Sequence, residues 1–335
     1  IQKCNLSCSY CFASQGDYGK SSVMSYETAI KAIQYFKKNS LKLHVVFFGG
    51  EPLLNFPLIK RIILWCKENS ENISFSVTTN GILLNKEKLL YFKENKVSIK
   101  LSYDGKQNQS KERPLKSGLS YENLFEKKLL LYKNLIKDSE SYIRSTYALE
   151  DFDKTKQSFE EIIQNFRQAF SFIKPQAQTK KEVIEKNIQK IKKLILGYIL
   201  KCKEEGKTEK ALTLLNLRHL VHKIKNQKNN DSFCSAGISY FTLSAEGNIY
   251  SCHRFNGKKE MILGNIKKEL NPSYQKELSK YRKNDKEPCK SCWIKNICQG
   301  GCLYEHNYSF EKEDVFCKIQ KMEVELALFY IKISN

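Results

Sequence analysis

The spacing of its cysteines constrains this chain more than any other feature of the sequence. Of the 12 cysteines among 335 residues, Cys4, Cys8 and Cys11 form a C-x3-C-x2-C run. A loop this short can place three thiolates around a [4Fe–4S] cubane and leave the fourth iron without a protein ligand. An open iron can bind amino and carboxylate groups, much as a catalytic zinc keeps one position free. A zinc knuckle is the alternative, although zinc takes four ligands and no fourth Cys or His lies close by in the sequence.

Seven more cysteines follow a second ordered pattern nearer the carboxyl end. Ordered spacings of this kind indicate metal ligands, either of iron–sulfur clusters or of two structural zinc sites. No signal-peptide pattern opens the chain, so we expect a cytoplasmic protein whose cysteines are ligands or free thiols rather than disulfides. Cys66 and Cys202 fall outside both patterns, and we expect them to be small buried hydrophobes. The second pattern is Cys234, then Gly247-x4-Cys252, then Cys289-x2-Cys292-x5-Cys298-x3-Cys302, and finally Cys317.

Composition excludes some classes of protein and leaves others open. Hydrophobic residues make up 41% of the chain, which is enough for a core. Charged or polar residues interrupt every apolar run, so no membrane span is expected. The net charge of +21 fits an anionic partner and fits a Lys-rich solvated surface equally well. Charge alone therefore does not indicate nucleic acid.

Apolar runs alternate with helical stretches from residue 41 onward, and the first run, 41–48, is rich in Val and Phe. Repeated βα units of this length predict an α/β fold with a parallel sheet curled into a full or partial barrel. In such a barrel the chemistry lies on loops at the carboxyl ends of the strands. The predicted strands are 41–48, 73–79, 97–103, 142–149 and 169–173, and the predicted helices are 26–38, 57–69, 86–95 and 121–137.

Three regions follow from this organisation. Within the last one, 238–244 and 248–252 predict a hairpin and 318–332 a final helix. Only Ile1 to Lys3 precede the first cysteine, whereas a strand needs about five residues. We therefore expect the first barrel strand to be largely missing from this sequence. The regions are the βα barrel over 1–180, a Lys-rich helical linker over 181–230, and the Cys-rich domain over 231–335.

A glycine-rich turn follows the first predicted strand. Its residues are Phe48-Gly49-Gly50-Glu51-Pro52. Two glycines allow the backbone to approach a ligand closely, and a carboxylate beside them can accept hydrogen bonds from an ammonium group. Its place at a strand's carboxyl end, after the cysteine loop, indicates a binding site.

Together, these residues resemble the radical S-adenosylmethionine (SAM) enzymes, and the likeness extends along essentially the whole chain. It implies a partial (β/α)6 barrel in which Cys4, Cys8 and Cys11 form the catalytic cluster site and the open iron chelates the methionyl end of SAM. For Asn80, a turn residue at a strand end is an alternative. The implied SAM contacts are Tyr10 near the adenine, Gly49, Gly50, Glu51 and Pro52 at the amino group, Asn80 at the same mouth, and Ser102 and Arg113 at the ribose and carboxylate.

The later cysteines resemble the SPASM domain of radical SAM maturases, which carries two auxiliary [4Fe–4S] clusters and so implies three clusters in all. Three ligands for the inner cluster leave one iron for a substrate thiolate, or for a water, a backbone atom or Cys202. Sulfatase-type maturases have a further cysteine here and an aspartate base in place of His253, and both differences count against a formylglycine-forming enzyme. The implied ligands are Cys289, Cys292, Cys298 and Cys317 for the outer cluster and Cys234, Cys252 and Cys302 for the inner one.

Residues 10–19, 24–27 and 247–253 look like those of peptide-modifying SPASM enzymes, closest to maturases of Cys-rich precursor peptides. This resemblance implies an oxidoreductase that cleaves SAM and installs a Cys thioether crosslink in a precursor peptide. It also implies a reducing donor such as a ferredoxin or flavodoxin. The alternatives are a carbon–carbon crosslink and an oxidised side chain. His253 is a candidate catalytic proton acceptor, or else forms a hydrogen bond to a cluster or to backbone.

Two functions of other classes stay open at this point. One is a radical SAM enzyme that acts on nucleic acid, which the positive charge would suit. The other is a non-enzymatic electron-transfer or zinc-binding protein. Cleavage of SAM by the reduced protein separates the second of these from an enzyme.

Overall fold

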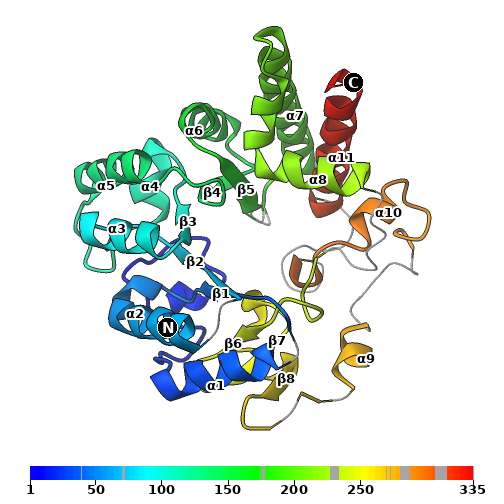
Figure 1. Cartoon of the computed structure of the whole chain (residues 1–335). Helices are drawn as coiled ribbons and strands as arrows, with labels where there is room; N and C mark the ends of the chain where they lie inside the picture. The colour runs from blue at the N-terminus through cyan, green and yellow to red at the C-terminus, as the bar shows by residue number, and fades with distance from the viewer. Residues whose placement is uncertain are drawn as a thin grey trace. The chain divides into compact units, whose positions relative to one another are not determined.

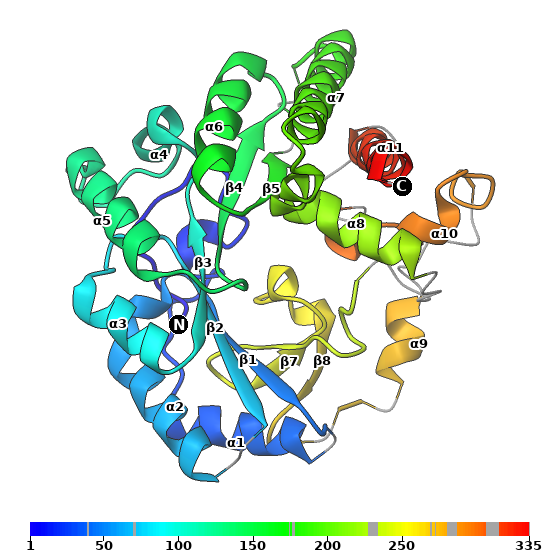
Figure 2. The same cartoon turned by 45° about the horizontal axis from the view of Figure 1, so that its top comes forward.

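The computed structural model describes residues 1–38, 40–69, 72–173, 175, 178–226, 234–268, 270–271, 273–279, 287–305 and 315–334. The chain forms two compact units (Figures 1 and 2). Unit 1 comprises Ile1–Arg144 and Ala236–Tyr274, and unit 2 comprises Ser145–Ser235 and Gln275–Asn335. Each unit therefore combines two segments that are separated in the sequence. Within the described ranges, every helix is too short or too polar to cross a bilayer.

A five-stranded sheet has its strands in chain order, from β1 to β5. The pairs β1/β2, β2/β3 and β3/β4 are parallel, and helices connect the strands. Burial alternates along β3, where Val97, Ile99 and Leu101 are buried and the residues between them are half-buried. This confirms the predicted half-barrel with one apolar face under the helices. The strands are β1 (Leu43–Phe47), β2 (Ile73–Thr79), β3 (Val97–Ser102), β4 (Tyr142–Ala148) and β5 (Gln168–Ile173).

The helices of unit 1 begin where the sequence supplies caps. The Ser25 side chain accepts a hydrogen bond from the Thr28 backbone N–H, and Asn85 does the same for Lys88. The helix α4 is polar throughout and gave no apolar period, so it was not predicted. The helices are α1 (Tyr26–Lys37), α2 (Phe56–Asn69), α3 (Lys86–Glu94), α4 (Lys106–Glu112) and α5 (Glu122–Leu135), with 3-10 turns η1 (Ser14–Gly16) and η2 (Pro52–Asn55).

The later segment of unit 1 contains a small antiparallel sheet in the order β6-β7-β8. The predicted hairpin is confirmed with shorter strands, β6 (Thr242–Leu243) and β7 (Asn248–Tyr250). The third strand, β8 (Ile262–Asn265), was not predicted. Gly247 adopts φ +84° at the turn, which favours glycine. The 3-10 turns η4 (His253–Phe255) and η5 (Lys259–Met261) follow β7.

Unit 2 is largely helical around one apolar core. Ile184, Ile188, Ile191, Ile195 and Ile199 form a buried stripe along α7, which is the spacing of one helix face. Its helices are α6 (Phe152–Asn165), α7 (Lys181–Glu204), η3 (Thr208–Thr213), α8 (Leu215–Lys225), α10 (Lys295–Cys298) and α11 (Val315–Ser334), and α9 (Tyr274–Ser279) begins at the unit boundary.

Both cysteines outside the two patterns are buried. Cys202 lies in this core with 2% of its surface exposed, and Cys66 lies in α2 with 1% exposed. The expectation of small buried hydrophobes is confirmed for both. The Cys202 thiol and the Tyr198 hydroxyl form a hydrogen bond, so the thiol has a partner inside unit 2.

Candidate functional site

The loop that carries the first three cysteines lies against the carboxyl ends of β1 and β2. The Gly50 N–H donates to the Ile1 carbonyl at 2.8 Å, and the Glu51 N–H donates to the Lys3 carbonyl at 2.7 Å. At the end of β2, Asn80 Nδ2 lies 3.7 Å from Cys4 Sγ and 2.8 Å from Asn5 Oδ1. The cysteine loop is therefore held at the edge of the sheet where α/β barrels carry their chemistry.

Gly49 and Gly50 are required by the close approach of the chain just before the loop. A Cβ on Gly49 would lie 2.0 Å from the Ile1 carbonyl oxygen, and one on Gly50 would lie 2.1 Å from that of Lys3. Gly49 also adopts φ +144°. The protein's own backbone at residues 1–3 makes this close approach, and a contact of the two glycines with SAM stays a prediction.

Glu51 holds the end of β2 in place. Its side chain has no exposed surface. Oε1 accepts hydrogen bonds from the Leu53 N–H at 3.0 Å and from Thr79 Oγ1 at 2.7 Å, and Oε2 accepts one from the Asn80 N–H at 2.7 Å. Burial raises the pKa of Glu51, while the bonds from Asn80 and Thr79 oppose that rise. Its contact with the amino group of SAM stays a prediction.

The three thiols lie within electrostatic range of one another. Burial raises the pKa of Cys8 to about 11, and Cys11 and Cys4 contribute to the rise while Arg113 opposes it. Cys4 Sγ accepts a hydrogen bond from the Leu6 N–H at 3.4 Å. Iron binds thiolates, so cluster binding here would displace the protons of these thiols. The donor set fits a cubane with three protein ligands.

Tyr10, Asp104 and Arg113 form a buried cluster beside the cysteine loop. The Tyr10 hydroxyl donates to Asp104, and Arg113 Nη1 donates to Tyr10 Oη at 3.0 Å and lies 3.7 Å from Asp104 Oδ2. Within the described part of the chain, Arg113 Nε is buried and lacks a hydrogen-bond partner. A donor in that state fits a ligand oxygen, so the site suits the predicted SAM contacts. Ser102 ends β3 nearby and pairs in register with Arg144.

The outer set of later cysteines converges within unit 2. Burial raises the pKa of Cys298 to about 12, and Cys317, Cys289 and Cys292 add to the rise. These are the four residues that the resemblance assigned to one cluster. Among the described residues, no three Cys, His, Asp or Glu side chains are close enough to hold a single metal ion. A cubane bonds each thiolate to a different iron, so its ligands stand farther apart than those of one ion.

The inner set is divided between the two units. Cys252 belongs to unit 1, whereas Cys234 and Cys302 belong to unit 2. Their shared cluster stays a prediction. Cys252 immediately precedes η4, and its Sγ lies 3.7 Å from Nδ1 of the adjacent His253.

His253 lies among aromatic rings that the sequence did not single out. Its ring centroid is 5.5 Å from that of Phe12 and 4.6 Å from that of Phe48, and Tyr240 Oη lies 2.9 Å from Nδ1. Phe12 follows Cys11 and His253 follows Cys252, so rings next to one cysteine of each pattern are in contact within unit 1. The spacing of residues in sequence gives no signal for such a contact.

Three cations act electrostatically on His253. Burial, followed by the charges of Arg144, Arg254 and Lys100, lowers the pKa of His253 to about 3. The ring is therefore neutral near neutral pH and is a weak proton acceptor. The observed hydrogen-bond partner of His253 is the Tyr240 hydroxyl, which is neither the cluster nor the backbone partner that the sequence suggested, and a role in proton transfer stays a prediction.

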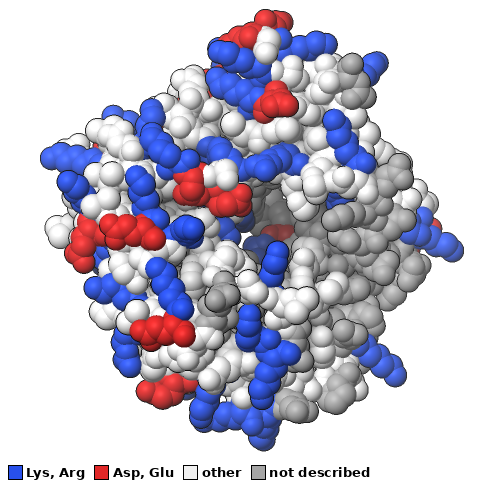
Figure 3. Space-filling model, viewed as in Figure 1, with Lys and Arg blue, Asp and Glu red and all other residues white. Residues whose placement is uncertain are grey.

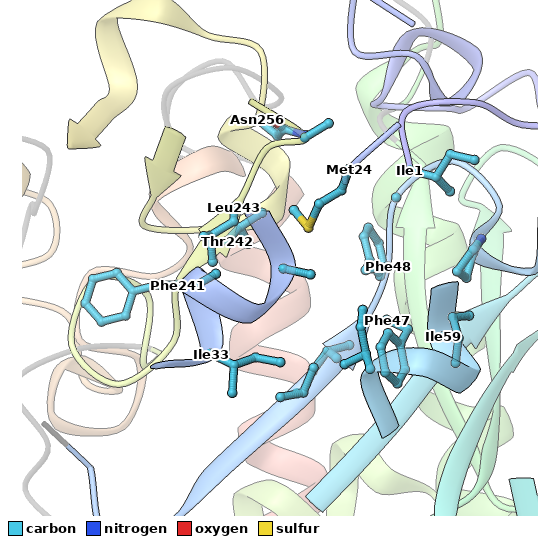
Figure 4. Close-up of a pocket in the computed structure, with 18 of the residues that line it drawn as sticks. Ile1, Met24, Ile33, Phe47, Phe48, Ile59, Phe241, Thr242, Leu243 and Asn256 are labelled. Atoms are coloured by element: carbon cyan, nitrogen blue, oxygen red, sulfur yellow. The ribbon is translucent and has the colours of Figure 1, made fainter. Parts of the chain in front are cut away.

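An apolar pocket of about 270 Å³ in unit 1 runs along β1. Figure 4 shows Phe47 of β1 and Ile59 of α2 at the right of it, and Ile33 of α1 with Phe241, Thr242 and Leu243 at the left. Consecutive residues 43–49 line it, so it follows the edge of this strand. The described residues around it include no cysteine, although Gly49 and Pro52 of the glycine-rich turn line one end of it.

Comparison with known proteins identifies the class. Residues 1–127 match the Radical SAM superfamily, and residues 234–293 match SPASM, an iron–sulfur cluster-binding domain. The chain thus carries a radical SAM domain followed by a SPASM domain, as its cysteine patterns predicted. Proteins of these two families bind SAM and iron–sulfur clusters, and the cysteine loop and the outer cysteine set fit such groups.

Two relatives and one solved structure refine the comparison. The radical SAM cyclopropyl synthase TigE of Paramaledivibacter caminithermalis is 28% identical over 182 residues, which are 49% of this chain and 37% of TigE. The chain therefore spans well under half the length of that relative. The Cys-type anaerobic sulfatase-maturating enzyme of Clostridium perfringens strain 13 is 25% identical over 322 residues, 89% of this chain and 85% of that enzyme. A structure of native anSMEcpe with bound AdoMet superimposes with a TM-score of 0.79 at 21% identity, covering 100% of this chain and 97% of the other. That likeness confirms the fold.

Proposed function

We propose that this protein is a radical SAM maturase that modifies a peptide or protein side chain. The observation that carries the proposal is the contact of Phe12, beside Cys11, with His253, beside Cys252. A substrate residue near this contact would lie close to the predicted SAM site and close to a predicted auxiliary ligand. The relatives support the substrate class, since one structure of the sulfatase-maturating type is described with a bound peptide.

The residues that would hold the cofactors are those with the fitting donor sets. Cys4, Cys8 and Cys11 would hold the first cluster, and Arg113 Nε would donate to SAM. The four outer cysteines would hold one auxiliary cluster, and Cys234, Cys252 and Cys302 a third cluster. When bound and reduced, these groups supply a 5′-deoxyadenosyl radical that removes a hydrogen atom, and an acceptor for the electron that remains after the new bond forms.

The protein's own contribution is positioning and exclusion of water. The Glu51 carboxylate fixes the Thr79–Asn80 turn, which in turn contacts Cys4. Phe12, Phe48 and the neutral His253 ring provide an apolar wall beside the loop. A dry wall of this kind protects a reactive carbon centre from side reactions.

For the product, we propose a thioether between a cysteine sulfur and a carbon of the same peptide. The support is the sequence: three cysteines remain for the inner cluster, which leaves one position for a substrate thiolate. The net change is loss of one hydrogen from carbon and one from sulfur. The hydrogen atom leaves with 5′-deoxyadenosine, and the proton and second electron leave separately.

Oxidation of a side chain, as in sulfatase maturation, is the second candidate. Its support is the match to the Clostridium perfringens enzyme along 89% of this chain. Anaerobic co-expression with a small Cys-rich open reading frame, if one lies beside the gene, followed by mass spectrometry of that peptide, separates the two. A thioether gives a loss of two hydrogens and a cysteine that no longer alkylates. A free cysteine beside an oxidised serine, or an aldehyde in place of the cysteine, supports the second candidate. An unmodified peptide, with no 5′-deoxyadenosine formed from SAM, contradicts both.

A further inference from the structure

Two long cationic side chains project from the inner face of the sheet in unit 1. Lys100 of β3 pairs in register with Tyr142 of β4, and Ser102 pairs with Arg144. Residues in register or two apart on a strand share a face, so Lys100 and Arg144 lie on the same face. With neighbouring strands about 4.8 Å apart and about 3.3 Å per residue, their Cα atoms stand about 8 Å apart.

This face is the one opposite the helices. Val97, Ile99 and Leu101, which alternate with Lys100, are buried, whereas Lys100 is half-buried and Arg144 is exposed. A third cation reaches the same region from the other segment of unit 1, because the Arg254 guanidinium lies over the Phe12 ring at 5.4 Å. All three charges act on His253.

The carboxylates at this edge of the sheet already have partners. Asp104 pairs with Arg113 and Tyr10, and Glu51 accepts three hydrogen bonds. Glu140, before the amino end of β4, is exposed and only partly offsets the effect of Arg144, so that burial and Arg144 together lower the pKa of Lys100. Across the ranges that the structure describes, neither Lys100 nor Arg144 makes a side-chain hydrogen bond or salt bridge.

Like charges that lie together on a half-buried face repel one another, and a bound anion would relieve this repulsion. Elsewhere on the chain, Lys and Arg are dispersed over the visible surface among neutral and acidic residues (Figure 3). The inner-face cations differ because all three act electrostatically on His253, one of the two rings whose contact carries the proposed function.

We propose that Lys100, Arg144 and Arg254 form a carboxylate-binding subsite that selects an acidic residue, or the free carboxyl terminus, of the peptide substrate. The proposal rests on the proposed function and names the substrate's charge. Guanidinium and ammonium groups together bind a carboxylate through charge-assisted hydrogen bonds. The carboxylate of SAM is the other source of the same chemistry, because Arg144 pairs in register with Ser102.

The test is equilibrium binding of defined probes to the full chain, purified anaerobically with its clusters. Fluorescence polarisation compares a labelled Gly-Cys-Gly-Glu-Gly-Glu-Gly amide with its Glu-to-Gln counterpart, in wild type, Lys100→Met and Arg144→Gln. Arg218→Gln, which removes an exposed cation from α8, is the matched control. We expect wild type and the control to bind the Glu peptide about tenfold more tightly than the Gln peptide. Each inner-face variant should remove most of that difference.

Four outcomes overturn the proposal. In the first, the two peptides bind wild type equally. In the second, Arg218→Gln removes the preference as fully as Arg144→Gln does, which assigns it to general surface charge. In the third, Arg144→Gln weakens binding of SAM in equilibrium dialysis while the preference for the Glu peptide persists. In the fourth, the inner-face variants weaken binding of a labelled single-stranded oligonucleotide and leave binding of the Glu peptide unchanged. Formation of 5′-deoxyadenosine from SAM is measured separately, so failure of the enzyme proposal and failure of the subsite are distinguishable.

Discussion

Substitution of Gly50 tests whether the glycine pair positions the cysteine loop. In Gly50→Ala, the new Cβ would lie 2.1 Å from the Lys3 carbonyl oxygen, 2.4 Å from its carbon and 2.6 Å from the Gly16 carbonyl oxygen. All three are backbone atoms, so no side chain can rotate away. To relieve these overlaps, the backbone must shift by about 1 Å, since favourable contacts begin near 3.5 Å. Overpacking costs about 1–3 kcal/mol, and loss of the two backbone bonds from Gly50 and Glu51 adds about 1 kcal/mol each.

We therefore expect Gly50→Ala to lose about 3–5 kcal/mol of unfolding free energy and to bind less iron at the first cluster. Urea unfolding followed by circular dichroism measures the first quantity, and iron analysis the second. Gly118→Ala, in unit 1, has open space but φ +73°, and should cost only about 1 kcal/mol. Gly197→Ala, inside α7 with nothing within 4 Å, should gain up to about 1 kcal/mol. A Gly50→Ala protein with wild-type stability and iron content would refute the reasoning.

Three further predictions follow from buried groups. Burial raises the pKa of Glu323 from 4.5 to about 7, so the folded state binds the proton more tightly than the unfolded state does. The free energy of unfolding should therefore fall by roughly 1–3 kcal/mol as pH rises from about 4.5 to 7. Urea unfolding at several pH values measures this loss, which should be smaller in Glu323→Gln. Arg113→Met should cost about 3–5 kcal/mol of unfolding free energy because it leaves the buried Asp104 carboxylate without its cation, and addition of Asp104→Asn should recover part of this loss. An Arg113→Met protein with the wild-type urea midpoint would contradict a stabilising Arg113–Asp104 ion pair. Cys202→Ala should keep all of its iron and lose about 1 kcal/mol, whereas a loss of iron would make Cys202 a cluster ligand.

The sequence predicted the sheet well because its strands are strongly patterned. Strand β2 is found at the predicted residues, 73–79, and β3 and β4 each end one residue earlier than expected. The alternation of apolar and polar residues along these strands is a property of the sequence itself, so it can be recognised without tertiary context. The misses are equally local: α4 has no apolar face, and β8 is four residues long and contains Gly264.

The candidate site also has a part that local sequence motifs predict and a part that only the fold brings together. Motifs identified the cysteines, and Cys289, Cys292 and Cys317 act electrostatically on Cys298, while the assignment of these four to one cluster stays a prediction. The contact between Phe12 and His253 joins residues that are 241 positions apart (253 minus 12), and no spacing rule connects them. Likewise, Lys100 reads in sequence as an ordinary strand lysine, and only the register with β4 places it near Arg144.

The most direct test of the central claim is the stoichiometry of iron and of SAM cleavage in anaerobically reconstituted protein. The account predicts about twelve irons per chain, four for each of three cubanes, and formation of 5′-deoxyadenosine on reduction with SAM present. The triple variant Cys4→Ala, Cys8→Ala, Cys11→Ala should keep about eight irons and form no 5′-deoxyadenosine. Wild-type protein that holds only one or two zinc ions, or that leaves SAM intact when reduced, would contradict the account.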